Sequence, residues 1–395
     1  MRATATHTTE YSPSAPLLYL AFELSNSSWK LFFSTGPAQP PRERSVSAGN
    51  LPALLREINL ARKRFGLPND APVLSCYEAG RDAFWLHRFL AQHGVHNLVV
   101  DSSSIQVPRR ARRTKTDRLD GFKLLSMLIR HASGDKEVWH VVHVPTPVQE
   151  DDRQLHRELE TLKQERTRHI CRIKAFLASC GLRIKLSPNF LQQLTSLRLW
   201  DGSPVPPALQ ARLRREWGRL QVVEDQIHEL EAERAHLLRT SSSPSVQKAR
   251  QLMRLRGIGE YSAWLYTMEF FAWRKFRNPK ELGALAGLTP TPSQSGDSSR
   301  ELGLNKAGNR HIRAMAIEIA CRLAPACRRF SRHERWNWLH FQPRSQLSCW
   351  YRNRFGSGSS RIRRIGIVAL ARKVLIALWR YLELGLIPEG ASLKA

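Results

Sequence analysis

The first part of the chain alternates short apolar runs with segments of helical periodicity. Apolar runs typical of buried strands occupy residues 17–24, 29–34, 72–76 and 97–101. Apolar residues at helical spacing occupy residues 51–65, 82–93 and 117–131. Strands that alternate with helices predict an α/β sheet domain, which here opens with a hairpin. We expect this domain to cover residues 17–145, because Pro145 and Pro147 interrupt the pattern.

Two long polar segments of helical pattern follow, at about 149–180 and 206–240, with the loop-like stretch 187–207 between them. In the second segment, apolar residues repeat every seven positions in two series, three residues out of phase: Leu213, Leu220 and Ile227, and Val223, Leu230 and Leu237. This is a heptad seam with charged flanks. It predicts an antiparallel helical arm or a dimerising coiled coil, although two surface helices of a bundle have a similar pattern.

The remaining sequence predicts a linker at 241–244, a mostly helical globular region from 246, and a flexible break at 356–360 before a basic amphipathic helix at 361–384. The resulting division gives a disordered N-terminus, the α/β domain, a helical coiled-coil region and a mainly α C-terminal domain. Their ranges are 1–16, 17–145, 146–245 and 246–395.

The net charge of the chain limits the classes of partner that we expect it to bind. The 395 residues contain 62 Lys and Arg against 34 Asp and Glu, a formal net charge of +28. Such an excess repels itself and is offset by a polyanion, so we expect a nucleic acid, with a ribosomal or membrane-surface protein as the alternative. The sequence contains no Cys-x-x-Cys pair, so a structural zinc site is not expected. No secretory signal is expected at the N-terminus. No membrane span is expected either, because Arg372 and Lys373 break the apolar run near the C-terminus. The predicted location is the bacterial cytoplasm near the nucleoid.

Four carboxylates stand where an α/β metal site needs them. Glu23 ends the first predicted strand and Glu78 follows the third, while Asp117 and Asp120 open a helix and share one face of it. Hard oxygen ligands of this kind bind Mg²⁺ or Mn²⁺. Each acid alone is also explained as a surface charge or a helix cap. The neighbouring cations favour acids that work beside bound phosphate: Arg109, Arg110, Arg112, Arg113 and Lys115.

The stretch 253–313 holds two further candidates. Gly257 and Gly259 lie in a turn similar to that of a helix-hairpin-helix, which either presents backbone amides to phosphate or packs two helices together. Ser295 precedes Gly296 on an unobstructed backbone and is a candidate nucleophile, in competition with the other serines of that loop. Cations that can surround a scissile phosphate follow in the sequence: Arg300, Lys306, Arg310 and Arg313.

Several of these strings together resemble a known family. They are YEAGRDAFWLHR at 77–88, VDSSSI at 100–105, KTDRLD at 115–120, GLTP at 287–290, QSG at 294–296 and NKAGNRHIR at 305–313. In this order they resemble the insertion-sequence transposases often called the IS-one-ten family, which includes the IS-eleven-eleven branch. The resemblance covers most of the chain.

The resemblance implies a fold and a mechanism. It implies a RuvC-like, ribonuclease-H-like DEDD domain at the N-terminus, whose four acids correspond to Glu23, Glu78, Asp117 and Asp120, and a second transposase domain whose nucleophilic serine corresponds to Ser295. Members cut and rejoin donor and target DNA through a phosphoserine link, in an active site composed across subunits of a dimer that assembles to a tetramer. A structured bridge RNA guides them.

Two positions depart from the family pattern. Glu23 stands where the family name expects Asp, and Leu304-Asn-Lys replaces the commoner Ile-Ser-Lys. Two other functions stay open: a metal-dependent nuclease of the Holliday-junction type, in which Ser295 is dispensable, and a catalytically decayed nucleic-acid-binding protein, in which Glu23 is a lesion.

Overall fold

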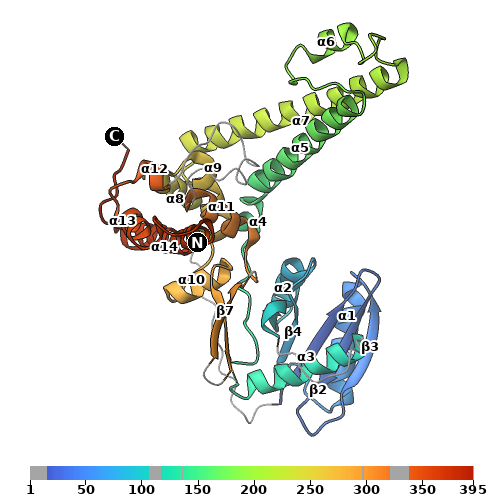
Figure 1. The fold of residues 1–395 in the computed structure, drawn as a ribbon. Coiled ribbons are helices and arrows are strands. Elements are labelled where there is room, and N and C mark those ends of the chain that lie inside the picture. Colours follow the sequence, from blue (N-terminus) through green and yellow to red (C-terminus); the bar gives the residue numbers. More distant parts are fainter. Residues whose placement is uncertain are drawn as a thin grey trace. The chain divides into compact units, whose positions relative to one another are not determined.

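The computed structural model describes residues 16–105, 117–135, 137–295, 298–305, 307–320 and 338–394. The chain divides into two compact units, 1–145 and 146–395 (Figure 1). The first unit is built on a sheet and the second is mostly helical, so the chain is a mixed α/β protein. The predicted disordered N-terminus, 1–16, lies outside the described residues except for Pro16.

A five-stranded sheet forms the centre of the first unit, in the order β3-β2-β1-β4-β5. The strands are β1 (Leu18–Leu24), β2 (Ser28–Ser34), β3 (Arg42–Ser47), β4 (Val73–Glu78) and β5 (Val95–Val100). β1, β2 and β3 pair antiparallel, whereas β1, β4 and β5 are parallel. The sequence pattern did not predict β3, because this edge strand is polar and buries only Val46, so it carries no apolar run.

Helices cover both faces of this sheet. The alternate residues Leu20, Phe22 and Tyr77 belong to the core formed with α1 (Leu51–Arg64) and α2 (Ala83–Gln92). The other alternate residues belong to the core formed with α3 (Asp117–Ala132): Ala21, Phe32, Cys76 and Val100. Because successive side chains of a strand point to opposite faces, these two sets define which strand residues face α3.

The first turns of α3 lie very close to the sheet. A Cβ built on Gly121 is only 2.0 Å from the Phe32 ring of β2, so only glycine fits there. Phe32 is paired with Ala21 of β1, two residues before Glu23. Gly121 therefore fixes the beginning of α3 against the part of the sheet that leads to Glu23.

The second unit contains a long antiparallel helical arm, formed by α5 (Gln154–Ser179) and α7 (Pro207–Thr240) (Figure 1). Buried residues of α7 include Leu213, Leu220, Val223 and Ile227 of the predicted seam. Near the end of the helix Arg234 and Leu238 are buried instead of the partly exposed Leu230 and Leu237, because a straight helix drifts from a seven-residue repeat. The seam thus packs within one chain.

The rest of the second unit surrounds a core shared by several helices. They are α8 (Pro244–Met253), α9 (Glu260–Tyr266), η2 (Thr267–Phe271), α10 (Pro279–Leu285), α11 (Arg310–Ala320), α12 (Trp338–Phe341), α13 (Gln346–Phe355) and α14 (Ser360–Leu384). Two shorter helices complete the unit: α4 (Pro147–Asp151) begins it, and α6 (Phe190–Ser196) lies in the connection from α5 to α7. No helix in the described part of the chain is long and apolar enough to cross a membrane.

The structure differs in part from three local predictions. The stretch 241–244 is not a linker: the Ser243 hydroxyl caps α8 by accepting from Val246 N at 3.2 Å, and Pro244 is the first residue of that helix. The stretch 187–207 is not wholly a loop, since α6 buries Phe190 and Leu194 against the arm. The predicted break at 356–360 is present between α13 and α14, and it is a tight corner, as Gly356 and Gly358 approach neighbouring atoms too closely for a Cβ. Serine and glycine serve caps and corners as well as flexible segments.

Candidate functional site: an acidic strand edge and a serine hairpin

Glu23 and Glu78 lie at neighbouring strand ends on the α3 face of the sheet. The parallel register of β1 and β4 pairs Phe22 with Tyr77, so the next residue of each strand is one of these glutamates. Both follow, by two positions, residues of the core under α3, namely Ala21 and Cys76. Since side chains alternate along a strand, both carboxylates belong to that face.

An open pocket of about 370 Å³ lies at this edge, with both glutamates among its lining residues. The strand ends and the loop after β4 form its walls: Phe22, Glu23, Leu24, Ser25, Asn26, Glu78, Ala79, Gly80, Arg81 and Asp82. Asp82 is a further acid of this pocket that was not among the predicted site residues. Its Oδ1 accepts from Trp85 Nε1 at 3.0 Å and its Oδ2 pairs with Arg81 at 3.4 Å. The feature that could have indicated its role is its place in the string 77–88, which also contains Glu78.

The other two predicted acids begin α3. Asp120 is half-buried and directly precedes Gly121, the residue that contacts Phe32. Asp117 is the first residue of the helix, and its side chain lies outside the described part. The backbone therefore brings the start of α3 to the face of the sheet that carries Glu23 and Glu78.

The carboxylates at this edge suit a hard cation in chemistry. Among the described residues, no three His, Cys, Asp or Glu side chains converge closely enough to form a protein-only metal site. Mg²⁺ does not require one, because it is usually held by one or two carboxylates, with waters and substrate phosphates completing its shell. The donor set of Glu23 and Glu78 in one open pocket fits that mode.

Ser295 is the last residue of β6 (Pro290–Ser295), which forms an antiparallel hairpin with β7 (Ser298–Leu304). Ser295 pairs with Ser298, so it stands at the tip of the hairpin. Figure 1 shows the hairpin extending from the helical body beside α10. Ser293 pairs with Arg300 further down the strands, so the competing serines occupy different places along the hairpin.

Two glycines lock the root of this hairpin. Gly287 has φ +66°, and a Cβ there is 2.2 Å from Arg313 Nη1. Gly308 has φ +140°, and a Cβ there is 2.6 Å from Gly287 N. Backbone hydrogen bonds from Asn305 N to Thr289 O and from Asn309 N to Leu285 O, both 2.8 Å, join the two sides. The strings GLTP and NKAGN are therefore one interlocked structural element.

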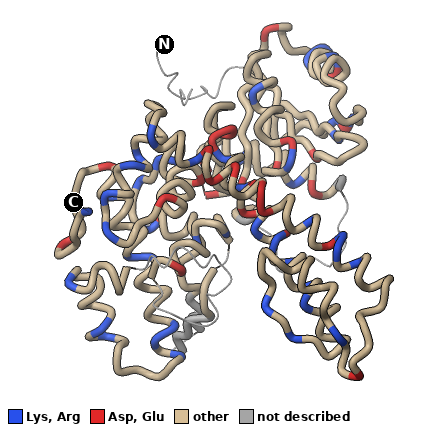
Figure 2. The backbone as a smooth tube through the Cα atoms, turned by 90° about the horizontal axis from the view of Figure 1, so that it is seen from above, with Lys and Arg blue, Asp and Glu red and all other residues tan. Residues whose placement is uncertain are grey.

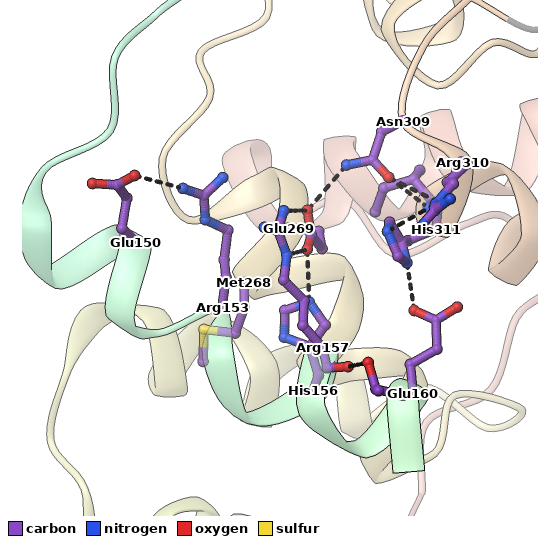
Figure 3. A network of polar contacts seen from close by, with 12 residues as sticks. Glu150, Arg153, His156, Arg157, Glu160, Met268, Glu269, Asn309, Arg310 and His311 are labelled. Carbon is purple, nitrogen blue, oxygen red and sulfur yellow. Dashed lines mark hydrogen bonds and ion pairs between the residues drawn. The ribbon is translucent and has the colours of Figure 1, made fainter. Parts of the chain in front are cut away.

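A buried carboxylate continues this root toward the arm (Figure 3). Glu269, in the π-helical turn η2, is fully buried and accepts from His156 Nε2 at 2.9 Å and from Arg157 Nη2 at 3.1 Å. Asn309 Nδ2 donates to the same carboxylate at 3.1 Å. One carboxylate thus joins α5, η2 and the residue that precedes α11. This cluster was not predicted, because no local sequence pattern distinguishes a buried Glu or His from a surface one.

A second pair reinforces the connection. His311 of α11 contacts Glu160 of α5 through Nδ1 (Figure 3). This hydrogen bond lowers the pKa of Glu160 more than burial raises it. At Glu269 burial acts to raise the pKa, but the hydrogen bonds from His156 and Arg157 outweigh it and hold the pKa well below its usual range. Both carboxylates are therefore ionised at neutral pH.

The glycine turn at 257–259 packs against the chain itself. Gly257 and Gly259 are buried, and Gly259 N donates to the Ser262 hydroxyl at 3.1 Å. The C-terminal segment covers the turn, with Lys394 Nζ donating to Ile258 O at 2.8 Å and Arg256 N donating to Ser392 O at 3.1 Å. The structure favours the packing interpretation of these glycines over phosphate binding.

The predicted phosphate-binding cations are described only in part. Arg310 is exposed at the start of α11, and Arg313 is half-buried beside Gly287. The side chain of Arg300 and all of Lys306 lie outside the described residues, as does the whole basic run: Arg109, Arg110, Arg112, Arg113 and Lys115. Figure 2 shows that Lys and Arg recur along the described chain rather than on one element.

Comparison with known proteins identifies the family. Residues 249–335 match the model of the "Transposase IS116/IS110/IS902 family". The chain is 36% identical over 391 residues to the "Putative transposase y4rJ" of Sinorhizobium fredii (strain NBRC 101917 / NGR234), covering 95% of this chain and 94% of that protein. It is 24% identical over 274 residues to the transposase for insertion sequence element IS1328 of Yersinia enterocolitica, covering 66% and 76%. The matched segment contains the hairpin and its root, and the first of these relatives extends the match through the acidic edge, so the chain belongs to the IS116/IS110/IS902 family of insertion-sequence transposases.

Proposed function

We propose that this transposase cuts and rejoins DNA with Ser295 as its nucleophile and an acidic Mg²⁺ site formed by Glu23, Glu78, Asp117 and Asp120. The observation that carries the proposal is the acidic edge, where two glutamates from parallel strands line one open pocket. The strand order β3-β2-β1-β4-β5, with three antiparallel strands followed by two parallel ones, supports a RuvC-like, ribonuclease-H-like assignment for this unit.

The hairpin supports the assignment of the nucleophile. Ser295 ends β6 at the tip of the hairpin, at the opposite end of the strand from the interlocked root. The Ser295 hydroxyl attacks the phosphorus of a phosphodiester, forms an O–P bond, and displaces one ester oxygen, which leaves as a hydroxyl after taking up a proton. Arg310 and Arg313, on the first turn of the adjoining helix, supply positive charge for the phosphate.

The acidic edge performs the complementary task. With Mg²⁺ held there, the edge would supply positive charge to stabilise the reacting phosphate oxygens. Glu23 and Glu78 would hold the ion from neighbouring ends of two parallel strands. Gly121 sets how close the start of α3, which carries Asp120, lies to the sheet, because a Cβ there would meet the Phe32 ring.

Guidance by a bridge RNA and assembly of dimers into tetramers belong to the same proposal. A net charge of +28 supports a chain that holds RNA as well as donor and target DNA. The arm seam packs within the chain, so subunit contacts use other surfaces of the arm, such as the exposed Val222.

The decisive experiment is recombination between donor and target plasmids, with the flanking RNA of the element supplied or withheld. We expect wild type to recombine only with RNA and to form a DNA adduct, and Ser295→Ala to do neither. Recombination by Ser295→Ala at the wild-type rate contradicts the serine mechanism and favours a metal-dependent nuclease. DNA binding without any cleavage by wild type indicates a catalytically decayed copy.

A further inference from the structure

The end of the chain is a continuously basic region. Between residues 338 and 382 there is no Asp or Glu. The same stretch contains Arg344, Arg352, Arg354, Arg361, Arg363, Arg364, Arg372, Lys373 and Arg380. Because no acid is close in sequence, any balancing negative charge has to come from elsewhere in the fold or from a partner.

The corner between α13 and α14 concentrates this charge at one place. A Cβ on Gly366 is 2.4 Å from the Phe355 ring, so α14 packs tightly against the end of α13 from this residue onward. All residues of α14 before Gly366 are exposed. We call residues 360–365 the projecting turn, because all six residues are exposed there, although Ile362 lies beside Gly358 and Tyr351 Oη donates to Arg363 O at 3.5 Å.

The projecting turn combines three arginines with two exposed isoleucines. Ile362 and Ile365 are 45% and 54% exposed, which is unusual for isoleucine next to packed helices. Within the described part of the chain, Arg361 and Arg363 make no ion pair, and Arg364 Nε donates only to Ser360 O at 3.2 Å. The exposed Arg352 and Arg354 stand on the last turn of α13, on the other side of the corner.

We propose that the projecting turn enters the major groove of duplex DNA, with Arg352 and Arg354 on the flanking phosphates. A helix with its side chains is about 10–12 Å wide and the major groove of B-DNA about 12 Å, so a helical turn whose residues are all exposed fits. The deep, narrow major groove of double-stranded RNA does not admit it. This proposal rests on the proposed function only in that the chain acts on DNA.

Each class of side chain has a defined task in this arrangement. The arginines neutralise backbone phosphates or donate to guanine edges. The isoleucines contact the methyl groups of thymine, the apolar feature of the major groove. The positive N-terminal end of α14 adds to the attraction, since its cap, Ser359, satisfies only one of the terminal amides.

The test is binding of the full chain to duplex DNA over a range of salt, for wild type and for Arg361→Ala combined with Arg363→Ala and Arg364→Ala. We expect the slope of log affinity against log salt to become shallower by about 0.9 per lost contact, up to about 2.7. The control variant replaces three exposed arginines of the arm by alanine: Arg168, Arg214 and Arg215. We expect it to keep most of the wild-type slope of log affinity against log salt. Equal effects of both variants overturn the proposal. If wild type binds no duplex DNA, the proposed function fails as well.

Two further binding experiments test whether the turn enters the DNA major groove. We expect the three arginine substitutions to weaken binding to duplex RNA of the same sequence far less than binding to DNA, and equal loss on both overturns the assignment to DNA. Ile362→Ala with Ile365→Ala should weaken binding to thymine-containing DNA several-fold and leave uracil-substituted DNA unaffected. No change on either DNA excludes groove entry. A melting temperature equal to wild type confirms that the exposed substitutions leave the fold intact.

Discussion

Asn309 joins Glu269 to the start of α11. Its Nδ2 donates to Glu269 Oε2 at 3.1 Å, and its Oδ1 accepts from His311 N at 2.9 Å and Ile312 N at 3.1 Å. One amide thus caps the helix that follows the serine hairpin and connects it to the buried carboxylate (Figure 3). Because Asn309 N also bonds Leu285 O, the residue fixes the hairpin root from both sides.

The two tasks of Asn309 can be separated by substitution. Asn309→Asp keeps the capping oxygen and replaces the donor with a second carboxylate beside Glu269. Two such carboxylates share a proton, so the introduced group has a raised pKa in the folded state. We expect a loss of about 1–3 kcal/mol in unfolding free energy at pH 7, which shrinks as the pH falls through that raised pKa. Urea unfolding between pH 4 and 8 measures it. Asn309→Ala should show a loss without that pH dependence, and identical pH profiles contradict the contact.

Removing the charge of Glu269 should destabilise the second unit. Glu269→Gln leaves Arg157 and the buried His156 without their anion, at a cost of about 3 kcal/mol. The pKa of Glu269 is lowered in the folded state, so its contribution is complete above the unfolded glutamate pKa of about 4.3 and is lost as the pH falls through the lowered value. The difference between wild type and variant should therefore be constant near neutral pH and shrink in acid. Glu229→Gln, at an exposed position of α7, is the control and should change little.

The glycines at the hairpin root should differ in their tolerance of alanine. In Gly308→Ala the new Cβ meets backbone atoms of Gly287 and Leu285, which cannot move away separately. In Gly287→Ala it meets the end of the Arg313 side chain, which can swing aside. Both positions have positive φ, so each substitution costs about 1–3 kcal/mol of strain, and we expect Gly308→Ala to be the more destabilising. Thermal unfolding of the two variants decides this, and the reverse order contradicts the described root.

Gly121 should control the acidic edge through packing alone. Gly121→Ala places a methyl group inside the Phe32 ring, so α3 must shift, at a cost of about 1–3 kcal/mol. We expect weaker Mn²⁺ binding by calorimetry, because Asp120 moves with the helix. Phe32→Leu in the Gly121→Ala background makes room and should restore part of both stability and metal binding. If Gly121→Ala binds Mn²⁺ with the affinity of wild type, α3 does not contribute to the metal site and the prediction is wrong.

The proposed metal ligands can be tested without DNA cleavage. Glu23→Gln and Glu78→Gln each keep the shape of the side chain and remove one anionic ligand. Since Mg²⁺ and Mn²⁺ prefer charged oxygen, we expect each to lower Mn²⁺ affinity at least about tenfold in calorimetry. Glu57→Gln is a matched control, because that glutamate pairs with Arg42 and Arg44 away from the pocket. Unchanged affinity in both pocket variants places the metal elsewhere.

Local patterns predicted most of the elements. The apolar runs and helical spacings of the first 145 residues correspond to β1, β2, β4, β5 and α1 to α3, because burial of one face leaves a period in the sequence. The polar edge strand β3 left no such period. Serine and glycine stretches misled at 241–244 and 356–360, since caps and tight corners use the same residues as linkers.

The sequence by itself determined the strand and helix order of the first unit, the excess of positive charge, and the strings that mark the family, because each is written in consecutive residues. Only the tertiary structure decided that Glu23 and Glu78 share a pocket, that Gly287 and Gly308 interlock, and that Glu269 joins three elements. These relationships join residues up to 113 positions apart. They depend on strand register and on close approaches between backbones, which packing of the whole unit sets and no local pattern encodes.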